Sequence, residues 1–147
     1  MLSAMPRSSL DGLTRTSDQL SDDLLLPDET VAIRGEARDF AERVLRPRAA
    51  ELNSATESSA VFPRDILTEI ADAGLYEVPF PADVGGRGLT FPMLGAATVL
   101  EELAYFAPGV ASALYDGQAL LVGRTLDAAP PHIRGEFLPR LIRGEIV

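Results

Sequence analysis

Residues 92–107, PMLGAATVLEELAYFA, indicate the fold class of this chain. Pro92 suits the first turn of a helix, where an amide hydrogen has no partner inside the helix. Small and aliphatic side chains then recur at spacings of three and one, which places them on one side of an α-helix. The segment therefore predicts an amphipathic helix with Glu101 and Glu102 on its exposed face. Its predicted apolar stripe is Met93, Ala96, Ala97, Leu100, Leu103, Ala104 and Ala107.

Two helices are predicted before this one. The first covers residues 28–52, and Pro47 is expected to kink it because proline lacks an amide hydrogen. The second begins at Pro63 and ends at Gly74, which suits a left-handed cap. The apolar stripes of the two helices are Ile33, Ala37, Phe40 and Val44, then Ile66, Leu67, Ile70 and Ala73.

Two more helices are predicted after it. Residues 110–126 are apolar on most sides, which predicts a buried helix. Residues 133–142 form the last predicted helix, which Pro139 is expected to restart in its middle. No strand alternation appears before the last three residues, where Ile146 and Val147 look like the entry to a strand. The expected fold is an all-α bundle of about five helices over residues 28–147, preceded by a disordered tail at residues 1–27.

Composition excludes several classes of function. The formal charge of −9 and the absence of a basic stripe argue against nucleic-acid binding. No apolar run approaches the roughly 20 residues of a membrane span. The chain has no cysteine, which rules out disulfides and zinc–thiolate sites and suits a reducing cytoplasm. We therefore expect a cytoplasmic protein that binds neither nucleic acid nor membrane.

No residue shows a catalytic, cofactor-binding or metal-binding pattern. Gly85, Gly86 and Gly88 match neither the dinucleotide fingerprint nor the P-loop, so a turn is the better interpretation. His132 is the single histidine and is expected on the surface, without a second histidine to share a metal. No serine lies in a nucleophile elbow. The chain therefore offers helices and no catalytic constellation.

Seven short strings nevertheless carry a family resemblance. The strings are RDFA (38–41), RPRAAEL (46–52), FP (62–63), AGL (73–75), PADVGGRGL (81–89), LEELA (100–104) and FLPRL (137–141), followed by GE (144–145). Over residues 28–147, their order resembles the N-terminal domain of acyl-CoA dehydrogenases. The stretch 129–134, APPHIR, departs from that family and is expected only to shift a surface helix.

The resemblance implies a function that needs more than this domain. In the family, a β-domain contacts FAD and a C-terminal helical domain supplies the base that removes the α-proton of an acyl-CoA thioester. Neither domain has a counterpart here, so the chain is expected to be an N-terminal fragment that is inactive alone and does not retain FAD. Its partners would be the acyl-CoA substrate of the complete enzyme, the missing downstream domains or further copies in a homo-oligomer.

The resemblance also implies one set of substrate-binding residues. Ser112, Tyr115 and Ala119 match positions that line the acyl cavity, about one helical turn apart, and Tyr115 would shorten that cavity. The alternative is that these side chains pack in the core of a buried helix.

Two alternatives remain for the whole chain. One is a stand-alone helical module that binds an acyl group or a separate flavoprotein subunit. The other is a fragment of an acyl-CoA oxidase or a flavin monooxygenase from the same superfamily.

Overall fold

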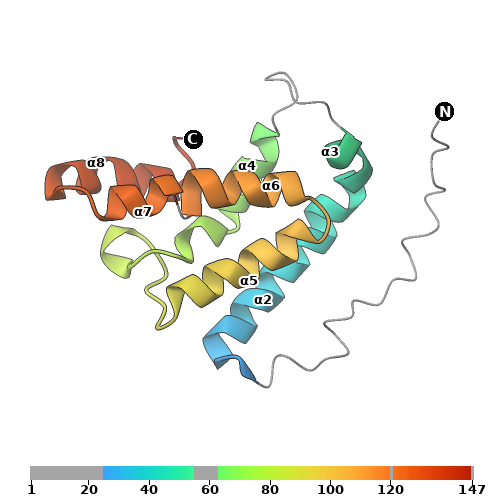
Figure 1. Ribbon diagram of the computed structural model, residues 1–147, viewed down its shortest axis with the longest axis horizontal. Coiled ribbons are helices and arrows are strands. Elements are labelled where there is room, and N and C mark those ends of the chain that lie inside the picture. Colours follow the sequence, from blue (N-terminus) through green and yellow to red (C-terminus); the bar gives the residue numbers. More distant parts are fainter. Residues whose placement is uncertain (1–24, 55–62, 120, 147) are drawn as a thin grey trace.

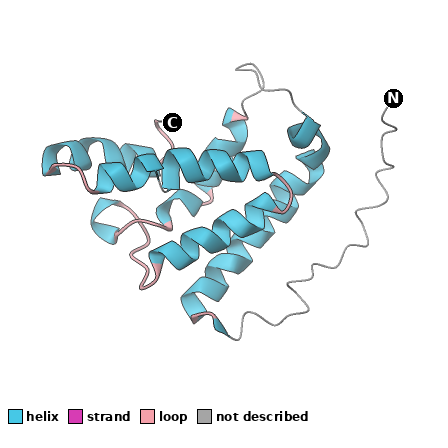
Figure 2. Cartoon of the chain, in the orientation of Figure 1, coloured by secondary structure: helices cyan, strands magenta, loops and turns pink. Residues whose placement is uncertain are grey.

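The computed structural model describes residues 25–54, 63–119 and 121–146, without the side chains of Gln118 and Ala119. Within these ranges every regular element is a helix (Figure 2), which confirms the predicted all-α class. Ile146 lies outside any strand in the described part, and Val147 falls beyond it. Most of the predicted tail, residues 1–24, also lies outside the described residues.

The sequence predicts a kink near Arg46, and at this place, just before Pro47, the first long helix changes its winding. It consists of α2 (Asp28–Phe40), the π-helical η3 (Ala41–Leu45), the 3₁₀-helical η4 (Arg46–Arg48) and α3 (Ala49–Ser54). The Arg46 amide donates to the carbonyl of Ala41, five residues back, and the Ala49 amide donates to that of Arg46, three residues back. Pro47 has no amide hydrogen to donate, and a wide π turn followed by a tight 3₁₀ turn keeps the backbone helical at this position.

The second helix, α4 (Arg64–Asp72), ends at the predicted glycine cap. Gly74 has a φ of 69°, a left-handed conformation that favours glycine, and its amide donates to the carbonyl of Ala71 at 2.8 Å. Leu75, directly after the cap, is buried and begins the short η5 (Leu75–Glu77). The chain then forms a loop that contains η6 (Ala82–Val84) and leads to the third helix.

The third helix, α5 (Pro92–Ala104), packs alongside α2 (Figure 1). Its buried face differs from the predicted stripe. Met93 is 40% exposed and Ala97 is exposed, whereas Val99 and Glu102 are buried. The prediction is therefore confirmed for Ala96, Leu103 and Ala107, which are buried, and was wrong for Met93 and Ala97. Leu100 and Ala104 are partly buried against the main core, and Glu102 is buried beside the arginines of α2.

Three helical segments follow: α6 (Pro108–Ala113), the π-helical η7 (Leu114–Ala119) that directly continues it, and α7 (Leu121–Asp127), with residue 120 outside the described residues. These segments together are called the helix at residues 108–127. The prediction that this helix is buried on most sides was wrong. Leu114 is 2% exposed, but Leu121, two α-turns later, is 56% exposed. The wider π turn takes up extra residues, so Gly123 instead of Leu121 returns to the buried side.

The last helix, α8 (Pro131–Ile142), runs through Pro139 without a break, so the predicted restart was also wrong. Its inner side chains hold it against a small second core, which compensates for the missing hydrogen bond. That core consists of Phe80, Val84, Leu138, Leu141 and Ile142.

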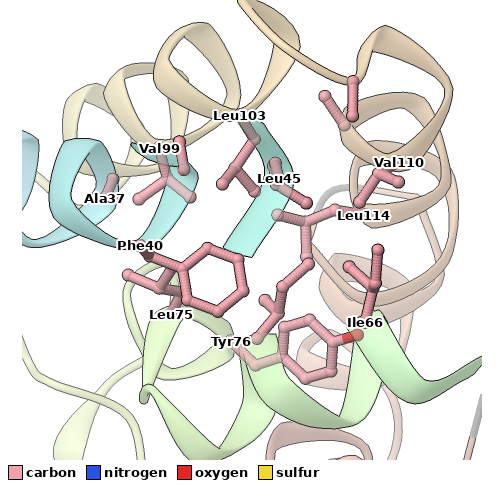
Figure 3. Close-up of a cluster of buried hydrophobic side chains, with 14 of the residues drawn as sticks. Ala37, Phe40, Leu45, Ile66, Leu75, Tyr76, Val99, Leu103, Val110 and Leu114 are labelled. Carbon is pink, nitrogen blue, oxygen red and sulfur yellow. The ribbon is translucent and has the colours of Figure 1, made fainter. Parts of the chain in front are cut away.

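The main core lies among α2, α4, α5 and α6. Figure 3 shows Phe40, Leu75 and Tyr76 meeting Leu103 and Leu114. These residues come from four different elements, α2, η5, α5 and η7, so one apolar cluster joins most of the bundle.

Candidate functional site

The helix at residues 108–127 carries all three predicted substrate-binding residues. Ser112 is exposed in α6, and Tyr115 is 43% exposed in η7, while Leu114 between them faces the core. Ser112 and Tyr115 therefore do not pack in the core of the described chain. The side chain of Ala119 lies outside the described residues, so only its place in the η7 backbone is known.

The same helix exposes more apolar side chains than the sequence predicts. Tyr115, Leu121 and Val122 are 43%, 56% and 47% exposed within eight residues. The change to π winding at η7 coincides with this region, and π turns are often found at functional sites. We call Ser112, Tyr115, Leu121 and Val122 the exposed set of this helix.

A network of ion pairs fixes the end of the helix to two other segments. The Arg134 guanidinium in α8 donates to Asp127 of α7 at 3.0 Å and to Asp83 of η6 at 2.8 Å. Arg124 donates to the second carboxylate oxygen of Asp127 at 2.8 Å. The hydrogen bond from Arg134 lowers the pKa of the Asp83 carboxyl. Sequence reasoning missed this network, because no local pattern links Arg134 to a residue 51 positions earlier.

A second group of charged residues joins α2 to α5, and it corrects the prediction that Glu102 is exposed. The Glu102 side chain is 4% exposed and accepts two hydrogen bonds from Arg38, at 3.2 and 3.0 Å. Glu101 is 61% exposed and pairs with Arg34 at 3.3 Å. A helix displays adjacent residues in different directions, so the two carboxylates take different environments. Each carboxylate has an arginine partner, which is the arrangement of a structural contact.

The glycine-rich loop does not fit the pyrophosphate of a flavin. Its amides donate to the chain itself: Gly85 to Ala82, Gly86 to Pro81, Arg87 to Glu77 and Gly88 to Phe80, all between 2.9 and 3.1 Å. A phosphate cradle needs such amides to point toward the ligand. The loop is thus a turn closed by its own hydrogen bonds, in agreement with the turn interpretation, and these four amides do not form a phosphate cradle in this conformation.

The described part of the chain shows neither a metal-ligand cluster nor a membrane-spanning helix. Residues 25–54, 63–119 and 121–146 contain no group of three potential metal ligands. None of the helices in those ranges has the length and apolar character that crossing a membrane requires. His132 is exposed at the start of α8, as predicted.

Comparison with known proteins identifies the family of this chain. The family model "Acyl-CoA dehydrogenase, N-terminal domain" matches residues 27–145. The 3-(aryl)acrylate reductase of Clostridium sporogenes is 32% identical over 114 residues, which is 77% of this chain and 28% of that protein. A probable medium-chain specific acyl-CoA dehydrogenase of Caenorhabditis briggsae, described as mitochondrial, is 31% identical over 138 residues, or 92% of this chain and 30% of the relative.

A shorter match points the same way. The benzylmalonyl-CoA dehydrogenase of Aromatoleum aromaticum is 36% identical over 67 residues, which is 46% of this chain and 17% of that enzyme. The chain thus spans less than a third of the length of each of these relatives. The family match covers all the helices described above, from α2 to α8. This chain therefore belongs to the acyl-CoA dehydrogenase family and corresponds to its helical N-terminal domain.

Proposed function

We propose that this chain is the helical domain of an FAD-dependent acyl-CoA dehydrogenase and forms one wall of its acyl-binding cavity. The helix at residues 108–127 would supply that wall, with Ser112, Tyr115 and Ala119 in contact with the acyl group. The reaction would introduce a double bond between the α and β carbons of an acyl-CoA thioester.

The observation that carries this proposal is the exposed set on the helix at residues 108–127. Leu121 and Val122 are half exposed although buried aliphatic side chains stabilise a folded domain. Exposed apolar side chains grouped on one element are typical of binding surfaces. The family match supports the identification of the ligand as an acyl group.

The proposed reaction requires a flavin-binding site and a catalytic base, and we assign neither to the described residues. The glycine-rich loop does not fit flavin, and each carboxylate of the α2–α5 cluster is held by an arginine. We therefore propose that the chain alone is inactive and that FAD and the catalytic base belong to other domains. Those domains would lie in a longer chain, in a partner or in other copies of a homo-oligomer.

The relatives support an oxidoreductase without fixing the direction of the reaction. Two are dehydrogenases by name, and the third is an acrylate reductase. An acrylate contains an α,β double bond, so the three names are compatible with redox chemistry at related carbon atoms. We propose a cytoplasmic location on the separate ground that the chain has no cysteine.

An exchange of domains tests the proposal. Residues 27–145 of this chain would replace the matching domain of the Caenorhabditis briggsae relative, and reduction of an electron-accepting dye by acyl-CoA would be measured. The hybrid should retain FAD and reduce the dye, whereas the 147-residue chain alone should do neither.

The relative without its first domain is the control, and it should show no acyl-CoA-dependent turnover. Two results would contradict the proposal. One is a hybrid that folds and holds flavin but shows no such turnover. The other is stoichiometric flavin on the isolated chain after gel filtration.

A further inference from the structure

The helix α7 has few side chains in either core. Its single buried residue is Gly123, which has no side chain to pack, and Leu121 and Val122 are exposed. Leu126 is only partly buried against the second core. The π turn of η7 also separates α7 from the well-packed α6. Apolar packing therefore contributes little to the direction of α7.

Arg134 supplies the contact that packing does not. Its Nε atom donates to Asp127 at 3.0 Å, and its two terminal nitrogens donate to Asp83 at 2.8 and 3.3 Å. The side chains of Arg134 and Asp127 are 24% and 16% exposed, so water competes with this pair only in part, whereas the side chain of Asp83 is 64% exposed. One planar guanidinium thus joins α8, the last residue of α7 and the loop at η6.

We propose that Arg134 is a positioning residue of the acyl wall: it holds α7 against α8 and η6, and thereby sets where Leu121 and Val122 lie. The consequence for the acyl group rests on the function proposed above. The stretch 129–134 was expected only to shift a surface helix. Its last residue is Arg134, which makes the contacts described above.

The geometry makes arginine hard to replace. A lysine ammonium is a point charge and cannot offer parallel donors to two carboxylates from one rigid plane. Arg134→Lys should keep contact with one aspartate and loosen the other. Arg134→Gln should lose the charge that holds both.

A spin label on the full 147-residue chain tests the hold on α7. The chain has no cysteine, so Leu121→Cys gives a single attachment point at an exposed position. Arg134→Gln should raise the mobility of the label and speed amide exchange in residues 121–127 about fivefold. For Arg134→Lys, both quantities should lie between those of Arg134→Gln and those of the parent chain. Thermal unfolding should shift little, because neither core is altered.

Arg140→Gln is the matched control. Arg140 lies on the same helix and pairs with Glu145 at 3.5 Å, just beyond the end of α8. The control should leave the label and the exchange rates unchanged. Equal effects in the two variants, or no effect of Arg134→Gln, would overturn the proposal.

The domain-exchanged enzyme separates this inference from the proposed function. There, Arg134→Gln should raise KM for acyl-CoA about fivefold and leave kcat nearly unchanged. An active hybrid whose KM ignores Arg134 would overturn the role in the acyl wall. An inactive parent hybrid would refute the proposed function, while the label would still decide whether Arg134 holds α7.

Discussion

Glu101 and Glu102 occupy different environments although they are neighbours on α5. The Glu102 side chain is 4% exposed and receives two hydrogen bonds from Arg38, whereas that of Glu101 is 61% exposed. Taking a carboxylate out of water is costly unless a cation and hydrogen bonds replace the water. The position of Glu102 therefore depends on the arginines of α2, and the two helices should be stable only together.

Substituting each glutamate by alanine tests this difference. Removing one partner of a buried pair costs roughly 3–5 kcal/mol, and because Arg38 is partly exposed we expect about 3 kcal/mol for Glu102→Ala. Glu101→Ala removes an exposed pair and should cost less than about 1 kcal/mol. The free energy of unfolding in urea gives both values. Equal losses would contradict the assigned burial.

Tyr76 gives a prediction for stability at high pH. Its ring is buried, its hydroxyl has no hydrogen-bond partner among the described residues, and burial raises its pKa above the ordinary value of about 10. The folded state therefore holds this proton more tightly than the unfolded state does. Stability from this group is complete below about pH 10 and declines as pH rises from there toward the folded-state pKa.

Tyr76→Phe removes both the buried hydroxyl and this titration. We expect a gain of about 1 kcal/mol at pH 7 and a smaller loss of stability between pH 7 and 11 than in the parent chain. The chain has no lysine, so few other side chains titrate in that range. Tyr105→Phe, at a 48% exposed position, is the control and should reproduce neither effect. Parallel pH profiles for parent and Tyr76→Phe would refute the prediction.

At the scale of elements, spacing predicted where helices lie better than which side they bury. The start at Pro92, the cap at Gly74 and the change of winding before Pro47 follow from the local chemistry of proline and glycine. The burial of Glu102 on α5 depends on ion pairs with α2, and the buried side of α7 depends on the π turn. The spacing of apolar residues within one segment predicts neither its contacts with another helix nor a local change to π winding.

The loop after α4 depends on one close approach. A side chain on Gly86 would overlap the carbonyl group of Phe80, which also accepts the Gly88 amide. Gly86→Ala should therefore distort the loop and cost at least about 2 kcal/mol. Gly135→Ala is the contrasting case, since it lies inside α8 with open space around it, and should stabilise by about 0.5–1 kcal/mol. The midpoints of thermal unfolding of the two variants should shift in opposite directions. A Gly86→Ala variant as stable as the parent chain would contradict the close approach of Gly86 to Phe80.

For the whole molecule, the exposed set on the helix at residues 108–127 is a feature that a lone helical bundle does not explain well. Ser112 and Tyr115 were predicted as acyl-contacting residues only through the family resemblance, and their exposure agrees with a contact outside this bundle. Leu121 and Val122 were not predicted as exposed, because the effect of a π turn is invisible in a pattern read with α spacing.

This surface should be measurable in the isolated chain. We expect the chain to bind a hydrophobic fluorescent dye, and the Leu121→Ser and Val122→Ser pair to reduce that binding by about half. Leu25→Ser is the control, because Leu25 is 89% exposed but lies before α2, outside the helix at residues 108–127. A dye-silent parent chain that remains monomeric would instead favour a self-sufficient module.

The acyl wall itself is tested most directly by Tyr115→Ala in the domain-exchanged enzyme. Tyr115 is predicted to shorten the cavity, so its removal should shift the preferred substrate, measured as kcat/KM over a series of acyl lengths, toward longer chains by about tenfold. Tyr105→Ala removes a similarly exposed ring from the end of α5 and should leave the preference unchanged. An unchanged preference in an active Tyr115→Ala enzyme, or the same shift in the Tyr105 control, would contradict the assignment of this helix to the acyl cavity.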